Sequence, residues 1–259
     1  MFQSLIKNSA VQLFALAAKL GVHRLPVFER VFLVLYAAYK RHFEAGPIER
    51  LQEFIPEGSL VIDVGANVGF FALRFAQWVG VGGEVVAIEP EDRNYQALLA
   101  ALKREGLSGR VRAMKAVAAA SAGPMFLEIN QLHPADHKLS RDGTGVAVEA
   151  VRLDDLVSDK GVLRPSLVKI DVQGAEMLVL QGASDILGLA APALFIELHD
   201  EGLQRFGASV SAILDYLSQY GYEPYWMMRH GPHRKISRAE ISAKAAGNAY
   251  VDVLFLKAA

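Results

Sequence analysis

One segment constrains the fold more than any other, because it joins a buried strand to an amphipathic helix through a glycine turn. It reads VIDVGANVGF from Val61 to Phe70, with glycines at positions 65 and 69. An apolar run that ends in glycines and continues with helical periodicity is typical of the first strand–turn–helix unit of an α/β fold. Backbone N–H groups at the start of such a helix attract a negatively charged or polar ligand. We therefore expect a ligand site at this turn.

Strand and helix patterns alternate along the rest of the chain. Such alternation predicts an α/β fold with a mostly parallel sheet and right-handed crossovers. The long connection 229–249, with one short helix, allows the last strand to run antiparallel. Strands are predicted at 60–64, 84–89, 111–117, 167–172, 193–199, 223–228 and 250–256, and helices at 70–79, 92–105, 175–187 and 210–220. Two further strand patterns, at 124–130 and 146–151, predict a β-hairpin or additional edge strands.

The length of 259 residues suits one large α/β core with a small appendage. We expect an N-terminal helical extension over 1–50 and one domain over 51–259 that carries an insert at 118–166. The apolar segments of the extension favour a helical cap or a homodimer surface. A substrate lid, or peripheral contact with a membrane surface, is the alternative.

Composition excludes several classes of function. The net charge of −1 gives no general attraction to nucleic acid. The chain has no cysteine, which excludes disulfides, thiolate nucleophiles and zinc–thiolate sites and favours a cytoplasmic protein. Its longest apolar run, 31–39, is shorter than the roughly 20 residues of a spanning helix. The basic run 229–235 is predicted to be a solvated loop, and contact with an anionic substrate is the alternative.

Acidic residues near the glycine turn indicate the class of ligand. Asp63 lies two residues before the first glycine, where its carboxylate would repel a diphosphate and suit a ligand with an amino group. Glu89 ends the second predicted strand, 24 residues after Gly65, where an acid accepts the ribose hydroxyls of a nucleotide cofactor. Together these two positions favour S-adenosyl-L-methionine as the cofactor.

Other residues of the predicted cofactor site come from the turn and from the ends of the strands. Asn67 is expected to brace the loop or to hydrogen-bond the amino-acid end of the ligand, and the alternative is a turn residue that tolerates a left-handed backbone. Ala118 offers a small side chain where an adenine ring could lie, although ordinary packing would choose the same residue. The predicted cofactor-binding residues are Asp63, Gly65, Ala66, Asn67, Gly69, Glu89, Pro90, Ala118 and Asp171.

Four motifs together resemble the FkbM family of S-adenosylmethionine-dependent methyltransferases. They are VIDVGANVGFF, the IEP that ends at Pro90, LDDL at 153–156 and KIDVQGAEMLVLQGA at 169–183. The resemblance covers roughly 45–200 and implies a class I methyltransferase (Rossmann-like) fold of seven strands, the last antiparallel. It also implies O-methylation of sugars, polyketides or other hydroxylated metabolites. The family's N-x-G-D-H-R loop is replaced here by a variant with Ala135 and Lys138, and its D-V-E-G motif has Gln173 in place of the glutamate.

Methyl transfer to a hydroxyl needs an aligned acceptor and benefits from a general base. Candidate side chains follow the strands whose carboxyl ends face the cofactor crevice. A histidine oriented by a carboxylate could serve as the base. A divalent-metal site built from Asp171, Glu197 and a histidine is an alternative that we do not favour. The predicted catalytic residues are His137, Asp136, Asp171 and His199, and the predicted substrate-binding residues are Glu176 and Glu197. We expect the helix dipole to keep Glu176 ionised.

The sequence therefore predicts an S-adenosylmethionine-dependent O-methyltransferase for a small or glycan-like hydroxyl acceptor. Two other functions remain open. An NAD-dependent oxidoreductase is disfavoured by Asp63 and by the missing second glycine of the dinucleotide fingerprint. A cofactor-binding partner subunit without turnover is suggested by the acid lost at Gln173, whereas Asp136 and His137 argue against it.

Overall fold

The computed structural model describes residues 48–130, 137–140, 142–158, 164–247 and 249–258. The chain divides into two compact units, Met1–Arg50 and Leu51–Ala259. The predicted helical extension, with its possible dimer or membrane surface, falls almost entirely outside the described residues. Within the described part of the chain, no helix is both long and apolar enough to cross a bilayer.

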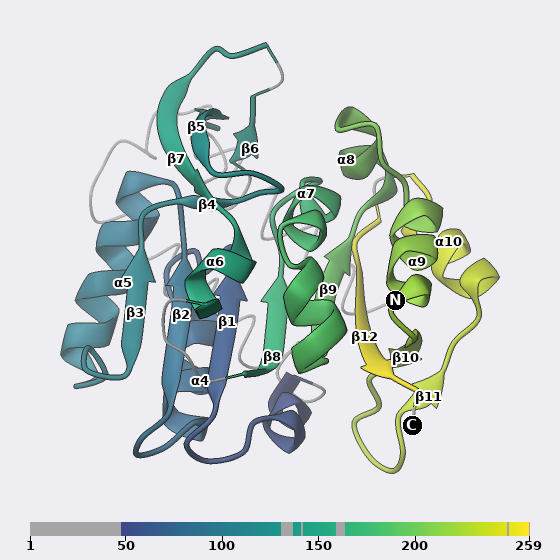
Figure 1. Ribbon diagram of the computed structural model, residues 1–259, viewed down its shortest axis with the longest axis horizontal. Coiled ribbons are helices and arrows are strands. Elements are labelled where there is room, and N and C mark those ends of the chain that lie inside the picture. The colour runs from purple at the N-terminus through teal and green to yellow at the C-terminus, as the bar shows by residue number, and fades with distance from the viewer. Residues whose placement is uncertain (1–47, 131–136, 141, 159–163, 248, 259) are drawn as a thin grey trace, which may run out of the picture. The chain divides into compact units, whose positions relative to one another are not determined.

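An eight-stranded sheet forms the centre of the unit Leu51–Ala259 (Figure 1). Its order is β11-β10-β12-β9-β8-β1-β2-β3. The run from β9 to β3 is parallel, and β12 is antiparallel to both of its neighbours, which confirms the predicted direction of the last strand. The strands are β1 (Leu60–Val64), β2 (Glu84–Ile88), β3 (Val111–Met114), β8 (Pro165–Ile170), β9 (Ala193–Leu198), β10 (Tyr222–Trp226), β11 (Arg234–Lys235) and β12 (Val251–Lys257).

The eighth strand corrects the predicted count of seven. β11 has two residues and lies within the basic run 229–235, which was predicted to be a loop. A strand this short has no periodicity in the sequence. Its two basic side chains form ion pairs, Arg234 with Glu240 at 3.1 Å and Lys235 with Glu223 at 2.6 Å.

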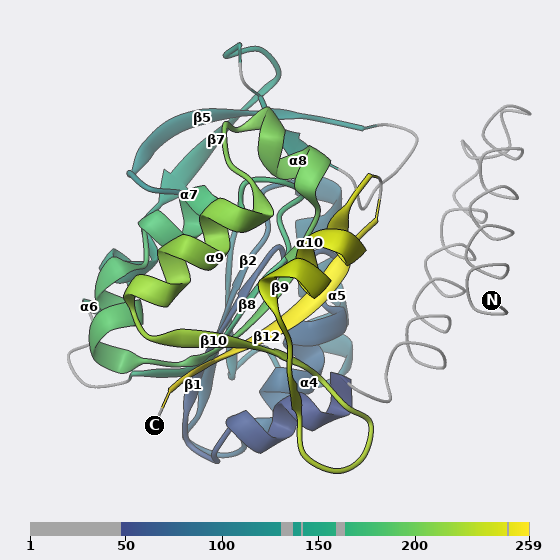
Figure 2. The same cartoon turned by 90° about the vertical axis from the view of Figure 1, so that its right-hand side faces the viewer.

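Helices cover both faces of the sheet, as a doubly wound fold requires (Figures 1 and 2). Helices α4 and α5 lie on one face, and α6, α7 and α9 lie on the other. The described helices are η3 (Glu49–Phe54), α4 (Phe70–Trp78), α5 (Asp92–Arg104), α6 (Leu153–Ser158), α7 (Glu176–Gln181), η4 (Ile186–Ala190), α8 (Asp200–Arg205), α9 (Val210–Gln219) and α10 (Arg238–Ala245). All five residues of β1 are buried, so the sheet itself supplies the centre of the core.

The helix predicted at 175–187 is interrupted. Gly182 lies so close to Ala119 that a Cβ atom there would be 2.0 Å from the Ala119 carbonyl oxygen. The carboxylate of Asp154 then accepts hydrogen bonds from the N–H groups of Asp185 (3.2 Å) and Ile186 (3.0 Å). These contacts end α7 and start the π-helical turn η4. They depend on residues distant in sequence, so the periodicity could not reveal them.

A second, four-stranded sheet lies beyond the carboxyl ends of the parallel strands (Figure 1). Its order is β4-β7-β5-β6, and β5 pairs antiparallel with β7. The strand predicted at 111–117 is confirmed only as far as Met114, because the chain then leaves β2 and pairs with β7 from Val117 onward. The strands are β4 (Val117–Ala118), β5 (Gly123–Glu128), β6 (Lys138–Leu139) and β7 (Val146–Val151).

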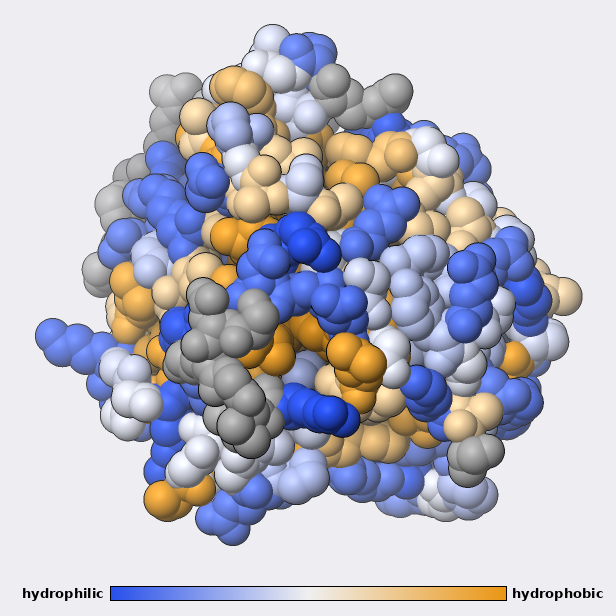
Figure 3. Space-filling model, viewed as in Figure 1, coloured by the Kyte–Doolittle hydropathy of each residue, from blue (hydrophilic) through white to orange (hydrophobic). Residues whose placement is uncertain are grey.

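On the face shown in Figure 3, apolar side chains occur in small groups among hydrophilic ones. Mixed surfaces of this kind are ordinary for a folded domain, because polar atoms alone cannot cover its surface.

Candidate active site

The glycine turn after β1 contains three residues with positive φ angles, a backbone conformation that most residue types adopt only rarely. Gly65, Asn67 and Gly69 have positive φ angles of 76°, 50° and 96°. A Cβ atom on Gly65 would lie 1.9 Å from the carbonyl oxygen of Asp171. The turn thus presses against the end of β8, and residue 65 must be glycine for both conformational and steric reasons.

The N–H groups of this turn bond within the protein, contrary to our expectation. Gly65 and Ala66 both donate to the carbonyl of Ile88 at 3.0 Å, and Gly69 donates to Ala66 at 2.9 Å. Asn67 donates through its backbone to Glu89 at 2.8 Å, while its side-chain oxygen accepts from Val68 at 2.8 Å. Asn67 therefore braces the loop in a left-handed conformation, and the turn does not present a set of open donors to an anion.

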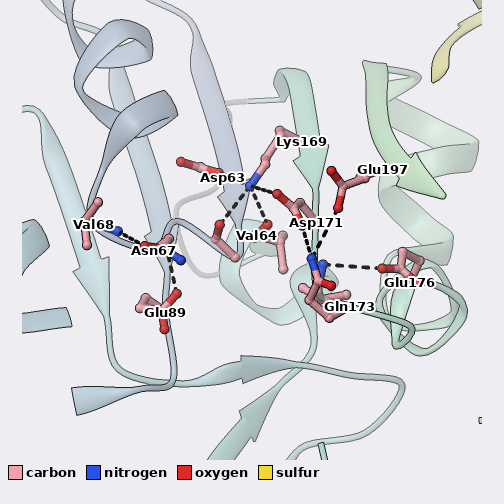
Figure 4. A network of polar contacts seen from close by, with 12 residues as sticks. Asp63, Val64, Asn67, Val68, Glu89, Lys169, Asp171, Gln173, Glu176 and Glu197 are labelled. Carbon is pink, nitrogen blue, oxygen red and sulfur yellow. Dashed lines mark hydrogen bonds and ion pairs between the residues drawn. The ribbon is translucent and has the colours of Figure 1, made fainter. Parts of the chain in front are cut away.

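Asp63 is fully buried, with 0% of its surface exposed, and its carboxylate faces Lys169 and not an open crevice. The Lys169 ammonium lies 3.3 Å from Asp63 Oδ1 (Figure 4). Burial raises the pKa of Asp63, while the lysine opposes that rise. Our argument that Asp63 contacts the amino group of a ligand is therefore wrong for this arrangement. Asp63 instead stabilises the buried cation beneath the turn.

Lys169 is a central residue of the site that sequence reasoning missed. Its ammonium donates to the carbonyls of Gly65 (2.8 Å) and Val64 (3.3 Å) and lies 3.6 Å from Asp171 Oδ2. It thereby ties the carboxyl end of β1 to that of β8. A lysine within the apolar run LVKI was the available signal, because a lysine is almost never fully buried unless it is paired.

Glu89 lies at the tip of β2, directly beside the glycine turn (Figure 4). Its carboxylate accepts from the backbone N–H groups of Asn67 (2.8 Å) and Glu91 (3.0 Å). Burial raises the pKa of Glu89 to about 7, against the effect of these donors. Pro90 follows it half-buried, and Glu91 caps α5 through the N–H of Asn94. This is the position predicted for the acid that binds the ribose.

Ala118 lies in the second sheet, paired with Val151 of β7. Its side chain is buried in the hydrophobic core. The packing alternative therefore accounts for this residue without a ligand.

Two acidic residues, Asp171 and Glu197, are linked by Gln173 (Figure 4). The side-chain nitrogen Nε2 of Gln173 donates to Asp171 Oδ1 at 3.1 Å and to Glu197 Oε2 at 3.2 Å. Asp171 follows β8, and Glu197 lies near the end of β9. The structure thus brings together two predicted site acids through a residue that the sequence suggested only as a lost carboxylate.

Glu176 is placed differently from our expectation. It is 2% exposed, and its Oε1 accepts from the backbone N–H groups of Gly174 (3.0 Å) and Val172 (3.4 Å). Burial raises the pKa of Glu176 to about 7, so the helix dipole does not keep it fully ionised at neutral pH. Glu176 thus shapes the loop between β8 and α7 through its Oε1.

The predicted histidines occupy separate positions. His199 precedes α8, and its ring stacks on Tyr250 with the centroids 4.2 Å apart. His137 accepts from the N–H of Asn130 through Nδ1 (3.1 Å), and its Nε2 lies 3.9 Å from Glu91. The acceptor nitrogen of the neutral ring is thus already used by a backbone N–H, which disfavours His137 as the base. Asp136 lies outside the described residues.

No group of three or more histidine, cysteine, aspartate or glutamate residues in the described ranges is arranged to hold a metal ion. The carboxylates of the alternative metal site already accept from Gln173. Among the described residues, that alternative therefore gains no support.

Comparison with known proteins decides the family. The model of the family described as "Methyltransferase FkbM domain" matches residues 63–224, which run from β1 to β10 and include every described site residue above. The chain belongs to the FkbM methyltransferase family. Its fold is accordingly a class I methyltransferase fold, with the antiparallel last strand that the resemblance implied.

Two curated relatives are similar over part of their length. The 31-O-demethyl-FK506 methyltransferase FkbM of Streptomyces tacrolimicus is 30% identical over 55% of this chain and 66% of its own. The hexuronic acid methyltransferase AglP of Haloferax volcanii is 27% identical over 60% of this chain and 62% of its own. The chain thus spans slightly less than two thirds of these relatives.

A solved FkbM methyltransferase from Methylobacillus flagellatus is 18% identical, covering 87% of this chain and 54% of its own with a TM-score of 0.49.

Proposed function

We propose that the protein transfers a methyl group from S-adenosylmethionine to a hydroxyl group of a sugar, a glycan or another small hydroxylated metabolite. The family supports methyl transfer. The acceptor class is supported by two relatives, one named for an O-demethyl substrate and the other for a hexuronic acid.

The observation that carries the proposal is the charge at the carboxyl edge of the sheet. Asp171, Glu197 and Glu89 lie there, and the nearest ammonium, that of Lys169, is shared with the buried Asp63. An excess of carboxylates suits a ligand with a sulfonium and an ammonium group. It disfavours a diphosphate, which needs backbone or cationic donors. Since the N–H groups of the turn bond within the protein, the NAD-dependent alternative is not favoured.

The residues present fit the cofactor in the following way. Glu89 would accept hydrogen bonds from the ribose hydroxyls, and the backbone of the turn from Gly65 to Gly69 would pack beside the bound cofactor. When bound, S-adenosylmethionine supplies an electrophilic methyl carbon on a sulfonium centre. The second sheet lies over this edge and would exclude water from it (Figure 1).

Proton transfer from the acceptor hydroxyl is the other task of the site. A carboxylate of Asp171 or Glu197, or the imidazole of His199, would accept this proton as the nucleophilic oxygen forms its new bond. A positioned base of this kind contributes about 10²–10⁴-fold to the rate. The substitutions Asp171→Asn, Glu197→Gln and His199→Gln distinguish the three, because only loss of the base removes turnover while cofactor affinity is retained.

The cofactor is tested by thermal unfolding with S-adenosylmethionine and, separately, with NAD⁺. A ligand at 100 times its Kd stabilises the folded state by about 2.7 kcal/mol. For a chain of this size that corresponds to a rise in Tm of about 5–10 °C. We expect the rise with S-adenosylmethionine, and we expect Glu89→Ala to remove it. Glu105→Ala, on an exposed carboxylate at the end of α5, is the matched control and should retain it.

Turnover is tested by incubating the protein with S-adenosylmethionine and a panel of sugars, uronic acids and polyketide alcohols. Mass spectrometry would detect the demethylated cofactor together with the methylated acceptor. Stabilisation by NAD⁺ alone, with no product from any acceptor, would contradict the proposal.

A further inference from the structure

Gln173 occupies an unusual backbone conformation for its residue type. Its φ angle is 59°, in the left-handed region that glycine and asparagine adopt more easily. The next residue, Gly174, is held against α8, because a Cβ atom there would lie 2.4 Å from the carbonyl oxygen of Gly202. The loop is therefore fixed by its neighbours, and a long side chain is retained at a position that disfavours one. Strained residues of this kind cluster at functional sites.

The side chain of Gln173 lies between two carboxylates (Figure 4). Ionised carboxylate oxygens only accept hydrogen bonds, so the group that faces them must be the amide NH₂ and not the amide oxygen. The NH₂ group has two hydrogens, and one is directed to Asp171 and the other to Glu197. Both donors of the amide are thus used, which fixes the side chain and its two partners in one arrangement.

Other charged groups face this pair. Lys169 lies 3.6 Å from the second oxygen of Asp171, and Glu176 and Asp63 are close enough to interact electrostatically with Asp171. Glu197 lies directly opposite Asp252 of β12 and two residues before His199, on the same side of its strand. Acids outnumber cations around Gln173, so repulsion would separate Asp171 from Glu197 unless a donor held them together.

We propose that Gln173 is a positioning residue, whose amide holds Asp171 and Glu197 side by side so that one of them can accept the proton of the acceptor hydroxyl. This inference rests on the proposed function. Two neighbouring carboxylates are often held together by a shared proton or by a bound cation. Here the two N–H donors of a neutral amide take that place. It favours the ionised form of both carboxylates, because hydrogen bonds to a charged acceptor stabilise its charge.

Three substitutions at position 173 distinguish the role of the side-chain amide from that of the left-handed backbone. Gln173→Gly suits the left-handed backbone and removes the amide. Gln173→Asn retains an amide on a shorter side chain that cannot reach both carboxylates. Gln173→Glu keeps the shape but adds a third carboxylate. Ala191→Gly is the matched control for relief of backbone strain, because Ala191 has a φ angle of 51° and precedes β9 at its opposite end.

We expect Gln173→Gly, Gln173→Asn and Ala191→Gly to bind S-adenosylmethionine with a Kd within about twofold of the parent, since the Gln173 side chain is bonded to neither the glycine turn nor Glu89. Gln173→Gly and Gln173→Asn should lower kcat by about tenfold or more, toward the lower end of the contribution of a general base. Gln173→Glu should move the acidic limb of the kcat–pH profile upward by about one unit, because the added carboxylate must share protons with the other two. Ala191→Gly should leave kcat and its profile unchanged.

A profile for Gln173→Glu that superimposes on that of the parent would overturn the inference. So would a parental kcat in Gln173→Gly. A second readout does not require turnover: ¹³C-carboxyl NMR titrations, with Asp171→Asn and Glu197→Gln to assign the signals, should show these two carboxylates titrating at higher pH in Gln173→Glu than in the parent. Failure of the parent to bind S-adenosylmethionine would reject the proposed function, while the NMR titrations would still decide the role of Gln173.

Discussion

Replacing the buried Glu176 by glutamine should stabilise the protein, and more so at high pH than at low pH. Burial raises the pKa of Glu176 from its ordinary 4.5 to about 7. A raised carboxyl pKa gives stability that is fully present below 4.5 and lost as the pH rises through 7. Glu176→Gln removes this loss, because the amide stays neutral and its oxygen can still accept from Gly174.

The size of the effect follows from the two pKa values. One pKa unit corresponds to about 1.4 kcal/mol, so ionising Glu176 opposes folding by about 3 kcal/mol at pH 8 and by about 1 kcal/mol at pH 5. The variant should therefore exceed the parent by about these amounts. Glu89, whose pKa is also raised to about 7, is present in both proteins and cancels in the comparison.

Urea unfolding followed by circular dichroism at pH 5 and pH 8 measures the difference directly. Glu149→Gln is the matched control, because Glu149 lies exposed on β7, and a surface change of this kind alters stability by at most about 0.5 kcal/mol. A gain that did not grow between pH 5 and pH 8 would refute the reasoning. A variant less stable than its parent at pH 8 would show that the donors from Val172 and Gly174 outweigh burial.

Two further substitutions test the support beneath the turn. Lys169→Met leaves Asp63 buried without its cation and should lower the free energy of unfolding by about 3–5 kcal/mol, and adding Asp63→Asn should recover part of that loss. A double-mutant cycle measured by urea unfolding gives the coupling between the two residues, and additive effects of the two substitutions would contradict it. Gly65→Ala places a Cβ atom 1.9 Å from the carbonyl oxygen of Asp171 and should abolish cofactor binding in calorimetry. Gly106→Ala, where φ is 69° and nothing lies within 4 Å of the added atom, should cost only about 1–2 kcal/mol and retain binding.

The order of strands and helices could be predicted because it depends on local pattern. β1, α4 and α9 are buried along regular apolar positions, and their predicted ends lie within one residue of the observed ones. The break at Met114 could not be predicted, because the chain changes partner there from β2 to β7, and both partners are apolar. Tertiary pairing, and not local preference, decides where that strand ends.

Several residues of the predicted site lie at the carboxyl edge of the sheet, as expected, but some of their side chains have partners that we did not expect. Position along the chain correctly placed Glu89 and Asp171 at the ends of their strands. The direction in which each side chain points could not be predicted from the sequence. Asp63 faces a buried lysine, and Glu176 faces the backbone of its own loop. Both acids lie close in sequence to the glycine turn or to Asp171, yet their carboxylates find their partners inside the protein. The lysine that determines this lies more than a hundred residues after Asp63, in another strand.

Lys169 also explains how the fold can hold several carboxylates near the ends of β1 and β8 while some of them keep their negative charge for a ligand. Its ammonium lies among the carbonyls of Val64 and Gly65 and the carboxylates of Asp63 and Asp171. It thereby links the glycine turn to the carboxylates at the carboxyl edge of the sheet. Asp63 and Lys169 largely cancel within the core, which leaves the charges of Asp171 and Glu197 as the field at the edge. A cationic ligand would be attracted there without any contact to Asp63. The sign of that field therefore favours a sulfonium cofactor even though the residue from which we first inferred it lies beneath the site.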